Sequence, residues 1–99
     1  MNNTQKRLSA AAWSMLESLS RQRKSVQKEL DFLHSVSPEF ASEKLESMLQ
    51  SIDHFNGEIS EFLSNMKEAT DKYALEREFD DLNARFVLLN KLADTLMGK

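Results

Sequence analysis

Cysteine is absent from this chain of 99 residues, which also contains only two glycines and one proline. Without cysteine there is no disulfide framework and no thiolate ligand for zinc. So few glycines and prolines leave little material for the tight turns that connect strands. No apolar run exceeds four residues, as in Phe86 to Leu89, whereas a helix that spans a membrane needs about 20. We expect no membrane span, and the lack of cysteine fits a cytoplasmic location.

What the sequence does contain is apolar residues at helical spacing. Between residues 45 and 66 they recur in steps of three and four, at Leu45, Met48, Ile52, Phe55, Ile59, Phe62 and Met66. Such a stripe is typical of a helix that packs lengthwise against other helices. Gly57 should weaken this helix by roughly 1 kcal/mol relative to alanine. It falls opposite the stripe, however, so we predict one helix that passes through the glycine.

Two further stripes flank this one. The first comprises Leu8, Ala12, Met15, Leu19, Gln22, Val26, Leu30 and Leu33, and the last comprises Leu75, Phe79, Leu82, Phe86, Leu89, Ala93 and Leu96. We expect Asn3 or Thr4 to cap the first helix, and we expect Gln22, the polar member of its stripe, to lie at the edge and reach solvent. Because Pro38 disfavours helix at the residue before it, the first helix should end by Val36.

The boundaries of the other helices follow from capping residues and phase. Ser37 should cap the second helix, with Pro38 as its first residue. The second stripe extrapolates to Ala69 and Tyr73, one residue out of phase with the third, and Thr70 and Asp71 are typical of a helix start. We therefore predict helices over about residues 4–35, 38–67 and 71–97.

These helices predict a single all-α domain over residues 1–99. The short connection at the proline makes the first two helices an antiparallel hairpin, which the third extends to a three-helix bundle with coiled-coil-like packing. The alternative is that the second and third helices form one helix of about 60 residues, about 90 Å long. That helix would need a dimer to bury its stripe.

Residues with catalytic or metal-binding chemistry are sparse. The two histidines, His34 and His54, should lie roughly 30 Å apart in the hairpin. A helical di-iron site needs a Glu-x-x-His motif on each of two helices and a glutamate on each of two more, and this pattern is missing. Neither a glycine-rich phosphate loop nor a Ser/His/Asp arrangement can be assembled. We therefore expect no enzyme, no metal and no cofactor.

Charge is distributed unevenly along the chain, whose net charge is −3. Residues 1–37 contain six Lys/Arg and three Asp/Glu, a balance of +3, whereas residues 38–66 contain one and six, a balance of −5. This contrast indicates that the first two helices are neighbours. Arg21, Arg23, Lys24 and Lys28 could also contact phosphates, so a nucleic-acid-associated regulator is the alternative function. This alternative is less favoured than protein binding, because the chain is acidic and lacks a helix-turn-helix pattern or an aromatic stacking platform.

The last helix is apolar beyond the width of one stripe. Phe86 and Leu89 should face the other helices, whereas Val87, Leu88 and Leu92 should face outward. Contiguous exposed apolar residues often mark an interface. We therefore expect a non-enzymatic adaptor, small chaperone or regulatory subunit that packs helices against a protein partner, and a homodimer when that partner is absent. The residues expected to bind the partner are Val87, Leu88, Leu92, Leu96 and, on the rim of the core, Trp13.

Overall fold

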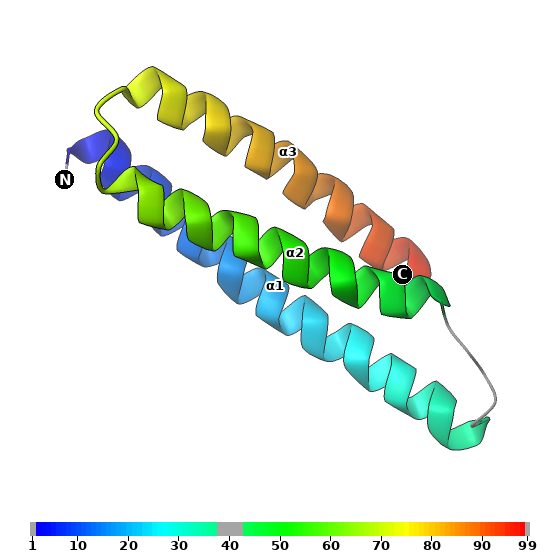
Figure 1. Ribbon diagram of the computed structural model, residues 1–99. Helices are drawn as coiled ribbons and strands as arrows, with labels where there is room; N and C mark the ends of the chain where they lie inside the picture. The colour runs from blue at the N-terminus through cyan, green and yellow to red at the C-terminus, as the bar shows by residue number, and fades with distance from the viewer. Residues whose placement is uncertain (1, 38–42, 99) are drawn as a thin grey trace.

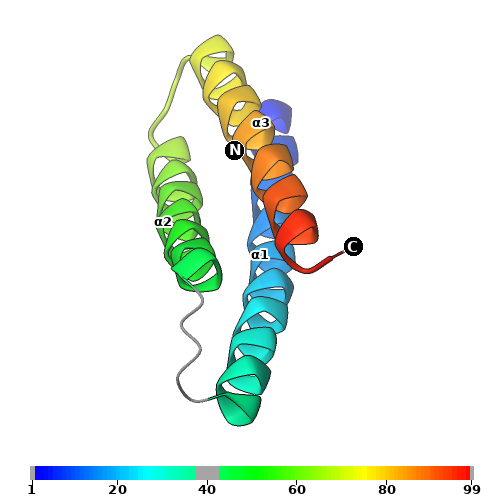
Figure 2. The same ribbon diagram turned by 90° about the vertical axis from the view of Figure 1, so that its right-hand side faces the viewer.

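The computed structural model describes residues 2–37 and 43–98, which form a bundle of three helices (Figure 1). These helices are α1 (Asn3–Val36), α2 (Glu43–Met66) and α3 (Lys72–Leu96). The helix α2 runs antiparallel to α1, and α3 returns alongside both in the direction of α1 (Figures 1 and 2). The predicted all-α three-helix bundle is therefore confirmed. The alternative of one helix of about 60 residues is wrong, because the chain turns at residues 67–71.

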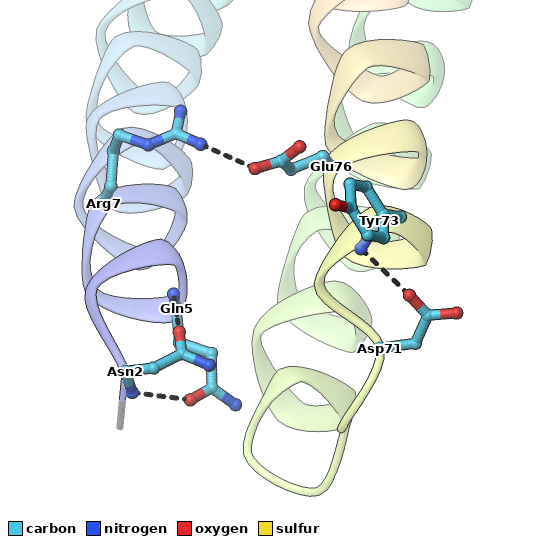
Figure 3. A network of polar contacts seen from close by, with 6 residues as sticks. All are labelled: Asn2, Gln5, Arg7, Asp71, Tyr73 and Glu76. Carbon is cyan, nitrogen blue, oxygen red and sulfur yellow. Dashed lines mark hydrogen bonds and ion pairs between the residues drawn. The ribbon is translucent and has the colours of Figure 1, made fainter.

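The start of α1 is closed by a capping box (Figure 3). The Asn2 side chain accepts a hydrogen bond of 2.8 Å from the Gln5 backbone, and the Gln5 side chain accepts one of 2.9 Å from the Asn2 backbone. Our expectation of Asn3 or Thr4 as the cap was wrong. A capping box needs glutamine or glutamate three residues after the cap, and here only Asn2 has one.

At the other end of α1, Ser37 is the C-cap of the helix. Its backbone N–H donates a hydrogen bond of 3.0 Å to the Leu33 carbonyl and closes the last turn. We also expected Ser37 to cap the second helix, and this prediction depends on residues 38–42, which lie outside the described residues. The expected position of Pro38 as the first residue of that helix lies outside the described residues, and the described part of α2 starts at Glu43.

The turn between α2 and α3 lies where the change of phase predicted it. Asp71 caps α3, and its carboxylate accepts hydrogen bonds of 3.0 and 3.2 Å from the backbones of Tyr73 and Ala74. Gln5 supports the turn from α1, since its Nε2 donates to the carbonyls of Met66 at 2.9 Å and Ala69 at 3.2 Å. The carbonyl of Met66 belongs to the last turn of α2, where carbonyls have no partner within the helix.

The core is made by the three stripes. Leu8, Leu19 and Val26 of α1 and Ile52 and Ile59 of α2 are at most 1% exposed. Gly57 lies on the exposed side of α2, and a Cβ added to it would meet no atom within 4 Å. The predicted helix through the glycine is therefore confirmed.

Gln22 is not the solvent-facing edge residue that we expected. Its Nε2 donates a hydrogen bond of 2.6 Å to Oδ1 of Asn90 on α3, and its Oε1 is buried without a hydrogen-bond partner. The expectation was wrong because α3 covers this side of α1. A second contact between these helices joins Arg7 and Glu76 at 3.3 Å (Figure 3). Within the described residues, no helix is long and apolar enough to cross a membrane.

Candidate functional site

The outer face of α3 carries exposed apolar side chains. Leu88 is 60% exposed, Leu92 56% and Val87 44%. On the inner face, Leu89 is buried and Phe86 is half-buried against Phe55, with 6.4 Å between the ring centroids. The expected division of this apolar segment into an inner and an outer face is confirmed.

Three of these outer and flanking residues form a row that we call the leucine strip: Leu88, Leu92 and Leu96. They follow one another at intervals of four residues, so each lies about 40° around the helix from the last. Leu96 is half-buried, and together with Leu92 it borders a groove beside Glu43 and Lys44 of α2. Val87 lies about 100° around the helix from Leu88 and is not part of this row.

Trp13 lies on another side of the bundle. It is 58% exposed on α1 and borders a cavity of about 300 Å³ with Leu63, Met66 and Lys67 of the α2 end. The structure therefore does not bring Trp13 next to the leucine strip. A partner that contacts both would have to reach around the bundle.

A groove follows the seam between α2 and α3 on the side away from α1, and we call it the α2–α3 groove. Three adjoining hollows form it. The first, beside Leu92 and Leu96, shares Ser47 with the second, a hollow of about 350 Å³. The second shares Glu58 and Arg85 with the third, of about 380 Å³. The leucine strip thus continues into a longer groove.

The middle of the α2–α3 groove contains a network of charged side chains. The Glu58 carboxylate binds Arg85 through one oxygen and lies 2.8 Å from Nε2 of His54 through the other. Arg85 also contacts Asp81 at 3.2 Å and lies over the Phe55 ring, 5.5 Å from its centroid. The hydrogen bond from Arg85 holds the pKa of Glu58 below its ordinary value, although burial opposes this shift.

The third hollow is acidic. Its lining includes four carboxylates, Glu58, Glu61, Glu78 and Asp81, and one cation, Arg85. Glu61 on α2 and Glu78 on α3 take part in no ion pair within residues 2–37 and 43–98. Sequence reasoning missed this groove. The residues that flank the two stripes could have indicated it, because flanking positions of adjacent helices line their seam.

The basic cluster of α1 is divided by the fold. Arg23 turns toward α2 and binds Asp53 with hydrogen bonds of 2.8 and 3.4 Å, so it does not belong to an open basic face. This pair confirms the expected contact between the basic first helix and the acidic second one. Arg21, Lys24 and Lys28 are exposed on one face of α1 and have no acidic partner among the described residues.

The two histidines lie on different helices. His34 is in the last turn of α1, and His54 is in the middle of α2 beside Glu58. In the part of the chain that the structure describes, no group of three or more His, Cys, Asp or Glu side chains is placed to hold a metal ion.

Comparison of the sequence with models of known protein families finds no match, and no curated protein or solved structure matches it either. The function therefore has to be inferred from the surface of the bundle.

Proposed function

We propose that this chain is a non-enzymatic helical interaction module of the cytoplasm: an adaptor, small chaperone or regulatory subunit. It binds a helix of a protein partner through the leucine strip of α3. The observation that supports this most directly is the exposure of Leu88 and Leu92, more than half of each side chain, one helical turn apart and beside Leu96. Single exposed apolar residues are ordinary, but a contiguous row is more typical of an interface.

The energy available from the strip sets the size of the contact. Burial of a leucine side chain contributes about 1.5–3 kcal/mol, so Leu88 and Leu92, already partly covered, would contribute about 2–4 kcal/mol together. Association costs an estimated 4–15 kcal/mol. The strip therefore needs further contacts in a stable complex. Between two copies, four leucines would be buried and would contribute about 4–8 kcal/mol before this cost is subtracted. The homodimer that we expect at micromolar concentration when no partner is present therefore also has to bury side chains beside the strip.

Co-purification tests this proposal. The tagged chain is purified from its own source, and the proteins that accompany it are quantified by mass spectrometry for the unsubstituted chain, Leu88→Asp and Tyr73→Asp. We expect Leu88→Asp to lose the partner and Tyr73→Asp, at an exposed position of the same helix outside the strip, to retain it. Light scattering of the pure chain near 11 kDa at micromolar concentration would count against the homodimer.

Folding controls are needed beside this measurement. Leu88→Asp should keep its helicity and melting temperature, because the new carboxylate is in water, whereas Phe86→Asp should unfold the chain by placing a charge in the core. The proposal fails if Leu88→Asp retains every partner. If Leu88→Asp unfolds the chain as Phe86→Asp does, then Leu88 belongs to the core and the strip is not an open surface.

The second candidate function is that of a nucleic-acid-associated regulator, and it is favoured by Arg21, Lys24 and Lys28, which are exposed and form no ion pair with the described part of the chain. Three phosphate contacts predict that binding weakens about 40-fold between 50 and 200 mM salt. Fluorescence anisotropy with duplex DNA and with RNA measures this. Lys24→Gln should weaken such binding, and Lys91→Gln on α3 serves as the control. Absence of salt-sensitive binding rejects this candidate.

A further inference from the structure

We infer that the α2–α3 groove takes an amphipathic helix of another protein whose one end is apolar and whose other end carries lysine or arginine. This inference rests on the proposed function and specifies the partner. Leu92 and Leu96 of the leucine strip line one end of the groove, and a set of carboxylates lines the other.

The length of the groove fits a helix. On α2 it extends from Glu43 to Asn65, and a helical rise of 1.5 Å per residue gives about 33 Å, the length of a helix of about 22 residues. Its lining includes apolar side chains in each hollow, namely Leu92 and Leu96, then Phe55 and Leu89, then Phe62 and Leu82. A helix seated here would be the fourth of a bundle, packed on two antiparallel neighbours.

The charges at the far end of the groove indicate what that helix carries. The four carboxylates and Arg85 leave a balance of −3 in the third hollow. Arg85 already binds two of them, Glu58 and Asp81. Glu61 and Glu78, on opposite walls of the hollow, form no ion pair with any residue that the structure describes. Neighbouring helices usually place opposite charges at such flanking positions, so a cation from a third helix would be the complementary group.

The end of the groove beside the leucine strip has a different character. There the lining consists of Leu92, Leu96, Thr95 and Ser47 with one acidic and one basic residue, Glu43 and Lys44. Because the charges of Glu43 and Lys44 balance, a helix that binds at this end would do so mainly through apolar contacts. The seated helix should therefore be polarised along its length, with apolar side chains at this end and lysine or arginine toward the α2–α3 turn.

A second copy of the chain fits less well. The exposed basic residues of a second copy that form no ion pair among the described residues include Arg21, Lys24 and Lys28 on α1, Lys67 at the α2–α3 turn, and Lys72, Arg77 and Lys91 on α3. None of these lines the groove. Such a contact would join two different surfaces, and contacts of this kind build open chains or rings in preference to a closed dimer. We therefore assign the groove to a helix of another protein.

Binding of designed peptides tests the inference. Three labelled helices of about 22 residues, the length of the groove, share one leucine face and neutral remaining positions. The first has three lysines near its N-terminus, the second has three near its C-terminus, and the third has glutamates at both ends. Fluorescence anisotropy measures their affinity for the full chain. We expect binding by the lysine peptide whose orientation in the groove brings its lysines to the acidic hollow. The glutamate peptide should bind at least about tenfold more weakly than that peptide.

The charge variants locate the contact. Glu61→Gln with Glu78→Gln should weaken binding of the lysine peptide by about tenfold, as expected for the loss of two partly exposed ion pairs. The matched control, Glu17→Gln with Asp80→Asn, removes the same charge from exposed positions outside the groove and should leave the affinity unchanged. Circular dichroism confirms that each variant remains folded.

Each other outcome overturns the inference. If the lysine and glutamate peptides bind equally and Leu92→Ser weakens both, the inference fails while the proposed function stands. If the control pair weakens binding as much as the groove pair, attraction is unspecific. If no peptide binds, the groove does not take such a helix. The proposed function is then still tested separately by the co-purification of partners with Leu88→Asp. If the chain self-associates and the groove pair abolishes this, the occupant is a second copy.

Discussion

Gln5 links the start of α1 to the end of α2 and the turn that follows it. Substitution of Gln5 measures how much these hydrogen bonds contribute to the free energy of unfolding. Among the described residues Gln5 is the one buried polar side chain, 7% exposed. Its amide donates to the carbonyls of Met66 and Ala69 and accepts from the Asn2 backbone. At about 1 kcal/mol for each hydrogen bond, Gln5→Ala should lower the free energy of unfolding by about 3 kcal/mol. For a small domain with about 5–15 kcal/mol in total, this is a large part.

The substitution Gln5→Glu separates the local contribution from the tertiary one. Glutamate suits the first turn of a helix and the capping box, a local gain of about 0.3–1 kcal/mol. Across the bundle, however, a carboxylate would replace the donor that lies 2.9 Å from the Met66 carbonyl oxygen. One carboxylate oxygen would keep the Asn2 N–H as its donor, but the other would face the carbonyl oxygens without a donor, and this costs more than the local gain. At pH 7 the glutamate variant should therefore be at least as unstable as the alanine variant.

The two substitutions should respond differently to pH. Burial and the two carbonyls raise the pKa of the introduced carboxyl above its unfolded value of about 4.3. The protonated side chain therefore contributes to the stability of the fold below the unfolded pKa, and this contribution is lost as pH rises through the folded pKa. Gln5→Glu should thus recover relative to Gln5→Ala as pH falls from 7 to 4. Urea unfolding followed by circular dichroism measures both. A glutamate variant as stable as the unsubstituted chain at pH 7 would refute the reasoning, because local capping would then outweigh the contacts to α2.

Three further predictions concern single positions, each measured by urea unfolding. Gly57→Ala should stabilise the chain by about 1 kcal/mol, since its Cβ meets no atom within 4 Å in a helix interior; a loss of stability would contradict this. Asp71→Ala should destabilise it by about 1 kcal/mol through loss of the α3 cap, whereas an unchanged midpoint would mean that the cap contributes nothing. Because Arg85 lowers the pKa of Glu58, this carboxylate contributes stability above its unfolded pKa of about 4.3 that is lost as pH falls through the folded pKa. Glu58→Gln should therefore reduce the loss of stability below pH 4.3, and an identical pH profile would argue against it.

The helices could be predicted because each depends on local spacing. The seven members of the second stripe, from Leu45 to Met66, are all buried, since apolar residues at steps of three and four can be covered only on one face of a helix. The turn at residues 67–71 followed from a phase change of one residue and from Asp71 as a cap. These inferences need no knowledge of which helix lies beside which.

Polar residues that act between helices could not be placed in this way. By residue type and position Gln5 is an ordinary residue of a first helical turn, yet it contacts residues 61 and 64 positions away. Gln22 was expected in water and instead meets Asn90. In each case a glutamine side chain can form hydrogen bonds with water or with another helix, and only the packing of the helices decides between these two.

The acidic hollow depends on the same turn that Gln5 supports. In one continuous helix, Glu61 and Glu78 would lie about 25 Å apart along the axis and could not act on one ligand. The turn at residues 67–71 reverses the chain and places them on opposite walls of one hollow. Two like charges there oppose the close approach of α2 and α3, whereas Arg85 links the two helices through Glu58. A helix that brings lysine or arginine to this end would remove that repulsion, so its binding should also strengthen the contact between α2 and α3.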